Sequence, residues 1–190
     1  MLERRNVVSA LLGTRGEMAV VTGLGSATYD VAAVGDHPRN FYLWGAMGGA
    51  ASLALGLAMA QPETPVVAIT GDGEMLMAIG TFCTIALQAP PNLSIVVLDN
   101  GLYGETGSQK SHTGVSDLAG IAKASGIAMI ETVTTSSELD EIAASISLTA
   151  GGPRVYVVKV SQEPKPRVLP LREGAHAKAR FREAFGLTAD

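Results

Sequence analysis

The sequence contains one cysteine, few charged residues and no excess of positive charge. Asp, Glu, Lys and Arg make up 17% of its 190 residues, and the formal net charge is −4. A chain without a basic face is not expected to bind nucleic acid. The single cysteine, Cys83, excludes a disulfide framework and an intrinsic iron–sulfur cluster. Because Cys83 lies in an apolar helical segment, we expect it to be a buried structural thiol.

Long apolar runs are also missing. The longest run, residues 46–60, is short for a membrane span and is rich in Gly and Ala. Charged and polar residues at positions 3–6 stand where a signal peptide has its apolar region. We therefore expect a cytoplasmic protein without membrane contact. Since apolar residues make up 47% of a chain with so little charge, we also expect extensive burial against partner subunits.

Apolar runs of strand length alternate with helix-length segments along the chain. This alternation predicts an α/β fold, with a doubly wound, mostly parallel sheet and helices on both faces. The length suits one domain, in which residues 1–160 form the body and residues 161–190 add a proline-rich strap and a last helix. Strands are expected at residues 18–22, 66–71, 94–99, 127–132 and 154–160, with a short segment at 41–44. Helices are expected at residues 5–12, 46–60, 74–87, 117–125, 136–147 and 172–185.

Small and oxygen-bearing residues end two of the apolar runs. The first run leads into Gly71-Asp72-Gly73-Glu74, and the second closes with Asp99-Asn100-Gly101. The carboxyl ends of neighbouring parallel strands meet at one crevice, where ligands bind. Asp72 and Asn100 offer the oxygen ligands that Mg²⁺ prefers, and the glycines and the next helix suit a diphosphate. Each motif alone is typical of a tight turn, but the pair predicts a site for Mg²⁺ and a diphosphate.

This pair resembles the thiamin diphosphate motif, in which Gly-Asp-Gly is followed by Asn at a second strand end. Asp99 stands where the family usually has a first Asn. The resemblance implies a thiamin diphosphate-binding fold in which Asp72, Asn100 and the backbone carbonyl of Leu102 hold Mg²⁺. It also implies that the cofactor contacts these residues together with Gly71, Gly73, Glu74, Tyr103 and Gly104.

A second segment, residues 41–49, resembles the part of thiamin diphosphate decarboxylases that cradles the aminopyrimidine ring. In that family a bulky apolar side chain separates the two rings of the cofactor and bends it, and Met47 stands at this place. The resemblance implies that the carbonyl of Gly45 accepts a hydrogen bond from the 4′-amino group and that Ala46 belongs to the same site. The alternative for Met47 is a core methionine that fills an irregular gap.

The segment at residues 100–115 is polar, long and rich in glycine, which indicates an active-site loop or disorder. With the two segments above, it resembles the beta subunit of sulfopyruvate decarboxylase and the matching half of phosphonopyruvate decarboxylase. The resemblance covers most of residues 18–160 and implies non-oxidative decarboxylation of a small 2-oxo acid with a second anionic group. His112 is then expected to relay a proton or bind an anion, and Lys110 to bind the sulfonate or phosphonate. A solvated loop is the alternative for both residues.

One catalytic group is not accounted for. Thiamin diphosphate enzymes use a carboxylate, usually Glu, against N1′ of the pyrimidine ring. In the family this Glu comes from a separate pyrimidine-binding domain, which has no counterpart within these 190 residues. The resemblance therefore implies a hetero-oligomer with a pyrimidine-binding alpha subunit, containing at least two of each chain.

Three other functions remain open from the sequence. A carboligase half resembling acetolactate synthase would share every cofactor residue and differ in its product. A 2-oxoacid oxidoreductase beta subunit carries the same domain, but Cys83 alone cannot hold a cluster, so electrons would leave through a partner. The third alternative is a non-catalytic, cofactor-binding subunit.

Overall fold

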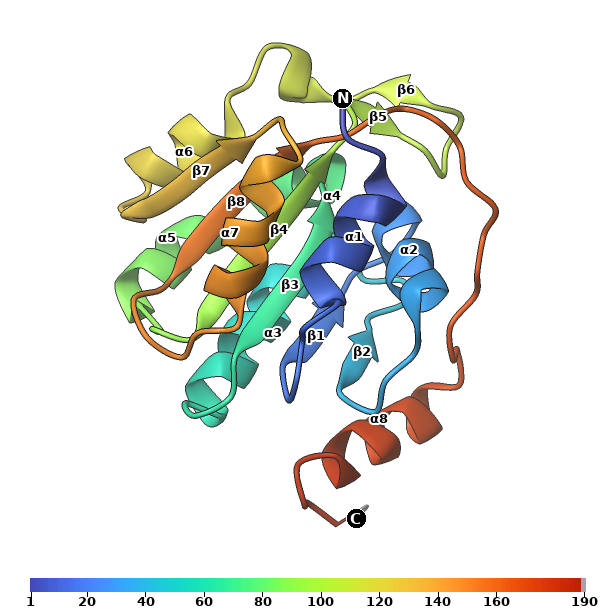
Figure 1. The fold of residues 1–190 in the computed structure, drawn as a ribbon, viewed down its shortest axis with the longest axis vertical. Helices are drawn as coiled ribbons and strands as arrows, with labels where there is room; N and C mark the ends of the chain where they lie inside the picture. Colours follow the sequence, from blue (N-terminus) through green and yellow to red (C-terminus); the bar gives the residue numbers. More distant parts are fainter. Residues whose placement is uncertain (189–190) are drawn as a thin grey trace.

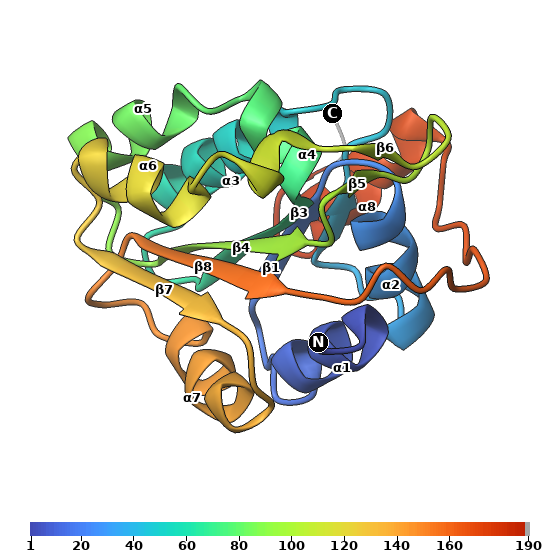
Figure 2. The same cartoon turned by 90° about the horizontal axis from the view of Figure 1, so that it is seen from above.

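The computed structural model describes residues 1–188 and contains a six-stranded parallel sheet between two layers of helices (Figures 1 and 2). The strands lie in the order β2-β1-β3-β4-β8-β7. The sequences of the central strands are continuous apolar runs, because helices cover both faces of the sheet and bury the side chains on each face. Their bounds are Ala19–Thr22 for β1, Asn40–Tyr42 for β2, Val66–Gly71 for β3, Leu93–Asp99 for β4, Met129–Val133 for β7 and Arg154–Lys159 for β8.

Helices α1, α2 and α7 cover one face of the sheet, and α3, α4, α5 and α6 cover the other (Figure 2). The first layer comprises Arg4–Leu12, Ser26–Val34 and Ser137–Ile146. The second comprises Gly49–Ala60, Asp72–Met77, Thr81–Gln88 and Leu118–Ala124. Each layer buries a separate hydrophobic core against the sheet. The predicted doubly wound α/β fold is thus confirmed.

The chain order reverses between β1 and β3. Strand β1 has β2 on one side, whereas β3 has β4 on the other. In open parallel sheets such a reversal opens a crevice beyond the carboxyl ends of the strands. Strands β1, β3 and β4 end there at Thr22, Gly71 and Asp99. The fold therefore brings the two predicted motifs to the same edge of the sheet.

The C-terminal segment wraps around the molecule to the β2 edge (Figure 1). After β8, residues 161–173 form an extended strap that leads to α8, Gly174–Glu183. The ring of Phe181 lies edge-on to that of Phe41, with centroids 5.3 Å apart, so the helix covers the edge strand. The last two residues of the expected 161–190 segment lie outside the described residues. Among the helices of residues 1–188, none has the length and apolarity needed to cross a bilayer.

Three features differ from the sequence prediction. Helix α2 was not predicted. Its residues 27–31 are all buried and therefore show no amphipathic period. The helix expected at 74–87 is broken between α4 and α5, and Gly80, with its low helix propensity, lies at the break. Cys83 is exposed rather than buried, because α5 directs Phe82 and Ile85 toward the sheet.

The segment at residues 100–115 is an ordered hairpin followed by one helical turn. Strands β5, Leu102–Tyr103, and β6, Gln109–Lys110, pair antiparallel, and the 3₁₀ turn η1 covers His112–Gly114. Of the two sequence alternatives for this segment, disorder is wrong. The hairpin lies over the carboxyl ends of the central strands (Figure 1).

Candidate active site

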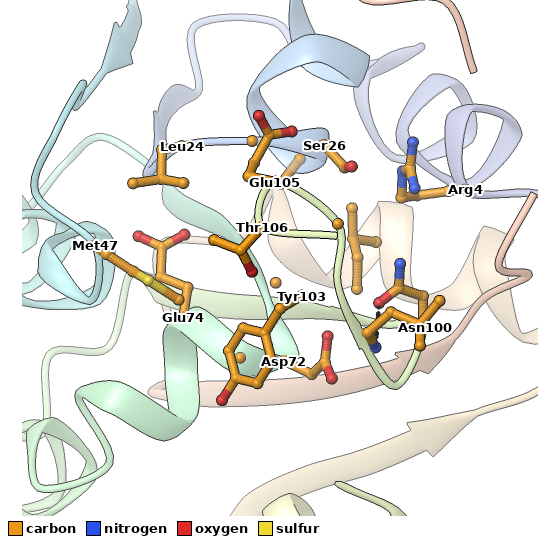
Figure 3. Close-up of a pocket in the computed structure, with 17 residues that line it drawn as sticks. Arg4, Leu24, Ser26, Met47, Asp72, Glu74, Asn100, Tyr103, Glu105 and Thr106 are labelled. Atoms are coloured by element: carbon orange, nitrogen blue, oxygen red, sulfur yellow. Dashed lines mark hydrogen bonds between the residues drawn. The ribbon is translucent and has the colours of Figure 1, made fainter. Parts of the chain in front are cut away.

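A cavity lies beyond the carboxyl ends of β1, β3 and β4, under the β5–β6 hairpin (Figure 3). Figure 3 shows Met47, Leu24 and Glu74 at one end of this cavity and Arg4, Ser26 and Asn100 at the other. Of the residues expected at the site, those lining the cavity are Met47, Gly71, Asp72, Gly73, Glu74, Asn100, Leu102, Tyr103 and Gly104. The structure therefore brings both sequence motifs and the Met47 segment to one space.

Asp72 begins α4 directly after β3 and is 1% exposed. Its Oδ2 atom accepts hydrogen bonds from the hydroxyls of Ser111 and, at 3.2 Å, Thr113. Within residues 1–188, Oδ1 accepts no hydrogen bond from another residue. Burial raises the pKa of this carboxyl above its usual value, and the nearby Asp99 adds to the rise even though the Ser111 hydrogen bond opposes it. Asp72 thus offers one oxygen to a metal ion.

Asn100 follows β4 and forms a turn. Its Oδ1 accepts a hydrogen bond from the backbone N–H of Leu102 at 2.9 Å, which starts the hairpin. The preceding Asp99 is absent from the cavity lining and forms an ion pair with Lys159. Asp99, which stands where the family usually has Asn, therefore has a charge partner on β8 and lies outside the cavity lining.

Glu74 connects the diphosphate motif to the Met47 segment. Its Oε1 accepts a hydrogen bond from the Gly48 backbone N–H at 3.2 Å, and Oε2 is buried without a hydrogen-bond partner in the described chain. Burial raises the pKa of the Glu74 carboxyl, while the nearby Thr70 hydroxyl and backbone N–H groups oppose the rise. A Cβ atom on Gly23 would lie 1.7 Å from Oε1, so only glycine allows this close approach. The unpartnered Oε2 suits a hydrogen-bond donor from a bound molecule.

Met47 lines the cavity and also an adjoining apolar groove, whose other residues are Gly73, Leu76, Met77, Tyr103 and His112. The core-filling alternative for Met47 does not hold, because the side chain contributes to both spaces. Gly45 and Ala46 are exposed beside it and do not line the cavity, and Gly45 turns the chain with φ +74°. The segment therefore presents one apolar side chain to the cavity.

The hairpin residues divide between the cavity and its outer edge. The ring of Tyr103 lies over Gly73, where a Cβ would come within 2.3 Å of it. His112 is exposed, and its Nδ1 lies 3.4 Å from the Tyr103 hydroxyl. Lys110 is exposed on β6 and lines neither the cavity nor the groove. Only His112 of the two expected catalytic residues thus faces the groove next to Met47.

Sequence reasoning assigned no role to the start of α2 or to Arg4. Leu24, Gly25 and Ser26 line the cavity at the N-terminus of this helix, which no side chain caps. Two glycines after a strand, followed by a helix start, are a usual signal for a phosphate-binding turn. Gly23-Leu24-Gly25-Ser26 carries that signal, but the helix behind it was not expected. No sequence motif marks Arg4 as a site residue, because its side chain reaches the cavity from α1, which is distant in sequence from the other lining residues.

The donor set fits a thiamin diphosphate with its metal ion. The cavity has a helix N-terminus at one end, an apolar side chain at the other, and the free Oδ1 of Asp72 between them. No group of three or more His, Cys, Asp or Glu residues is arranged to hold a metal within the described chain. Mg²⁺ is commonly held by one or two carboxylates together with substrate phosphates and water, so Asp72 with Asn100 and a diphosphate suffices.

Comparison with known proteins decides the family. Residues 23–160 match the thiamine pyrophosphate enzyme, C-terminal TPP binding domain. The chain is a member of that family. A sulfopyruvate decarboxylase subunit beta from Methanothermobacter thermautotrophicus is 42% identical over 130 residues, which cover 68% of this chain and 70% of the relative. Membership of this family identifies thiamin diphosphate as the cofactor. It also confirms the resemblance that the sequence motifs indicated.

Two further relatives extend this result. A phosphonopyruvate decarboxylase from Streptomyces viridochromogenes is 34% identical over 170 residues, which cover 87% of this chain and 42% of the relative. This thiamine pyrophosphate enzyme chain therefore spans about two fifths of that protein. A 2-oxoglutarate:ferredoxin oxidoreductase structure from Magnetococcus marinus superposes with a TM-score of 0.66 at 17% identity, covering 97% of this chain and 76% of the other. That likeness concerns the fold alone, while the closer sequence relatives agree with a thiamin diphosphate-dependent decarboxylase subunit.

Proposed function

We propose that this chain is the cofactor-anchoring subunit of a split decarboxylase that depends on thiamin diphosphate and Mg²⁺. Its substrate is a 2-oxo acid with a second anionic group, either sulfopyruvate, giving sulfoacetaldehyde, or phosphonopyruvate, giving phosphonoacetaldehyde. The observation that carries the proposal is the meeting of Asp72, Asn100 and Met47 in one cavity of a chain 42% identical to a sulfopyruvate decarboxylase beta subunit. Residues 1–160 form the cofactor domain in this proposal, and 161–190 belong to it.

The metal ligands in this proposal are Asp72, Asn100 and the carbonyl of Leu102. The free Oδ1 of Asp72 supplies the negative charge. Ser111 and Thr113 hold the other oxygen and so fix the orientation of the carboxylate. The carbonyl oxygen of Asn100 accepts one hydrogen bond, from the Leu102 N–H, and has a second lone pair for the metal.

The remaining residues position the cofactor and substrate. The bound cofactor supplies a reactive carbon that accepts the electron pair released with CO₂. Met47 would support the two rings of the bound cofactor, and the carbonyl of Gly45 would accept a hydrogen bond from its 4′-amino group. His112 and Lys110 lie at the outer edge of the cavity, where the imidazole and the Lys110 ammonium group can donate hydrogen bonds to the sulfonate or phosphonate.

A pyrimidine-binding alpha subunit completes the site in this proposal, with at least two copies of each chain. The groove beside Met47 is apolar and open, which suits contact with a second chain. The relatives named subunit beta support a separate alpha subunit. The phosphonopyruvate decarboxylase extends well beyond the part that this chain matches, and we place the pyrimidine-binding half in that remainder.

The test is product analysis of the complex with a sulfopyruvate decarboxylase alpha subunit. The complex receives thiamin diphosphate and Mg²⁺ with sulfopyruvate, phosphonopyruvate or pyruvate, and CO₂ and the organic product are measured. Sulfoacetaldehyde or phosphonoacetaldehyde supports the proposal. Acetolactate from pyruvate would favour the carboligase, and transfer of electrons to an added acceptor would favour the oxidoreductase. Full activity after Asp72→Ala would favour a non-catalytic chain.

A further inference from the structure

Arg4 is the one cationic side chain that lines the cofactor cavity within residues 1–188. The other charged side chains there are Asp72, Glu74 and Glu105. Glu105 pairs with Arg167, whereas Asp72 and Glu74 are acidic groups of the space that a diphosphate, with at least two negative charges, would enter. Mg²⁺ offsets part of this charge near Asp72. At the end away from Met47 the cavity adjoins a second one, which Arg4 lines together with Arg5, Lys165 and Arg167, so positive groups gather at this end.

An ion pair with a buried carboxylate holds the side chain of Arg4 in place. Arg4 is 7% exposed, and its Nε donates to Oδ2 of Asp30, a fully buried residue of α2. The other carboxylate oxygen of Asp30 accepts from Nε of Arg5 at 3.0 Å. Two guanidinium groups thus share one buried carboxylate, which leaves a net positive charge at this point. Such a buried charge is costly unless it is paired.

The outer nitrogens of Arg4 are free. Guanidinium groups carry five N–H donors in a planar fork, and in the described chain neither Nη atom of Arg4 has a hydrogen-bond partner. Figure 3 shows the guanidinium at the same end of the cavity as Ser26, the first residue of α2. The N-terminus of this nine-residue helix adds uncapped N–H groups and a positive dipole end.

We propose that the Nη nitrogens of Arg4 bind the diphosphate of the cofactor, with Asp30 orienting the guanidinium. This inference rests on the proposed function. An Arg fork suits phosphate oxygens better than an ammonium group does, because it donates two parallel hydrogen bonds. Arg4 then joins the Asp72 metal site and the α2 N-terminus as the third anchor of the diphosphate.

Arg5 provides a matched control. It contacts the same Asp30 carboxylate, but its Nη2 donates to the carbonyl of Pro166 at 2.7 Å, and it does not line the cofactor cavity. Its side chain is more exposed than that of Arg4. A variant of Arg5 therefore disturbs the Asp30 cluster without removing a group from the cavity.

The experiment is calorimetric titration of the complex with an alpha subunit, in Mg²⁺, using thiamin diphosphate and thiamin as separate probes. The quantity compared is the ratio of the thiamin Kd to the thiamin diphosphate Kd. We expect Arg4→Met to lower this ratio by about tenfold to a hundredfold, the value of charged hydrogen bonds, and Arg4→Lys to lower it by a smaller factor. Arg5→Met, which leaves the Arg4 fork in the cavity, should lower the ratio less than Arg4→Met does.

An unchanged ratio in Arg4→Met, with both probes weakened equally, would overturn the role of Arg4 and leave the proposed function intact. If Arg4→Met does not fold, Arg4→Lys decides alone, and an unchanged ratio overturns the inference. Wild-type complex that binds no thiamin diphosphate would instead overturn the proposed function.

Discussion

The two helical layers of the sheet differ in where they carry charge. The layer of α1, α2 and α7, here called the charged layer, contains Arg4, Arg5 and Asp30 as a paired cluster and acidic residues along α7. Within the other layer, the part formed by α3, α5 and the second half of α4, here called the uncharged layer, has no Asp, Glu, Lys, Arg or His, whereas α6 contains Lys123. Residues 40–62 and 75–98 contain none of these side chains.

The low charge content of the sequence is therefore concentrated on the surface of the uncharged layer. In the uncharged layer Met59, Met77 and Leu87 are 53%, 68% and 80% exposed. Met77 also lines the groove next to Met47, so the uncharged surface begins at the mouth of the cofactor cavity. An apolar surface without charge is typical of the core of a subunit interface. We therefore expect the alpha subunit to cover the uncharged layer and to leave the charged layer in solvent.

The largest expected effect comes from replacing Asp72, which begins α4 at the boundary of the uncharged layer. Asp72→Ala removes the only carboxylate that we assign to the metal, and loss of even a supporting residue lowers metal affinity by about tenfold to a hundredfold. We expect Mg²⁺-dependent binding of thiamin diphosphate to fall at least a hundredfold, measured by titration calorimetry of the complex. Asp140→Ala, on the exposed side of α7, serves as the control and should bind as the wild type does. Equal binding by both variants would contradict the metal assignment.

A new charge in the uncharged layer should have the second largest effect. Met77→Glu places a carboxylate in a surface that becomes desolvated on assembly, and hot-spot changes of this kind cost about 2 kcal/mol or more. We expect the affinity for the alpha subunit to fall by at least about tenfold, measured by analytical ultracentrifugation. Leu148→Glu is the matched change beyond α7, at a side chain that is 52% exposed. If Leu148→Glu weakens assembly as much as Met77→Glu does, the two layers do not differ as we infer.

The smallest effect concerns an ion pair beside the charged layer. Arg180 of α8 pairs with Asp36, which follows α2. Partial burial raises the pKa of Asp36, but hydrogen bonds from Arg180 and Tyr42 outweigh this, and the pKa lies below its usual value. The pair therefore stabilises the fold above the ordinary Asp pKa, and this stabilisation is lost as pH falls through the lowered value.

We expect Arg180→Met to lower the unfolding free energy by roughly 0.5 kcal/mol at neutral pH, because the pair is partly exposed. The difference from wild type should vanish in acid, as followed by urea unfolding at a series of pH values. Lys178→Met, at an exposed position of the same helix, should show no such pH dependence. A difference that grows in acid would contradict the sign of the linkage.

The strands, and the meeting of the Asp72 and Asn100 motifs at one edge of the sheet, could be predicted because their signals are local. Buried parallel strands read as apolar runs between Gly and Pro, and Asp72 and Asn100 follow two of them directly. Strand order then brings the two ends together without any information from distant residues. The role of Met47 was predicted from the resemblance of residues 41–49 to a segment of the family.

The parts that could not be predicted depend on contacts between distant segments. Asp30 interrupts the apolar pattern of α2, and it is tolerated because Arg4 and Arg5 reach it from α1. The hairpin at residues 100–115 is held by Ser111 on Asp72, a pair 39 positions apart. Exposure of Cys83 depends on how α5 is rotated about its axis, which one short apolar helix does not specify.

The most direct test of the split-enzyme claim is the rate of sulfopyruvate and phosphonopyruvate decarboxylation by the purified chain with and without an alpha subunit. Both reactions contain saturating thiamin diphosphate and Mg²⁺, and CO₂ release is followed over time. The chain alone should show no turnover, because the carboxylate that activates the pyrimidine ring comes from the partner, and the mixture should release CO₂ from one of the two substrates. Robust turnover by the chain alone would contradict the account.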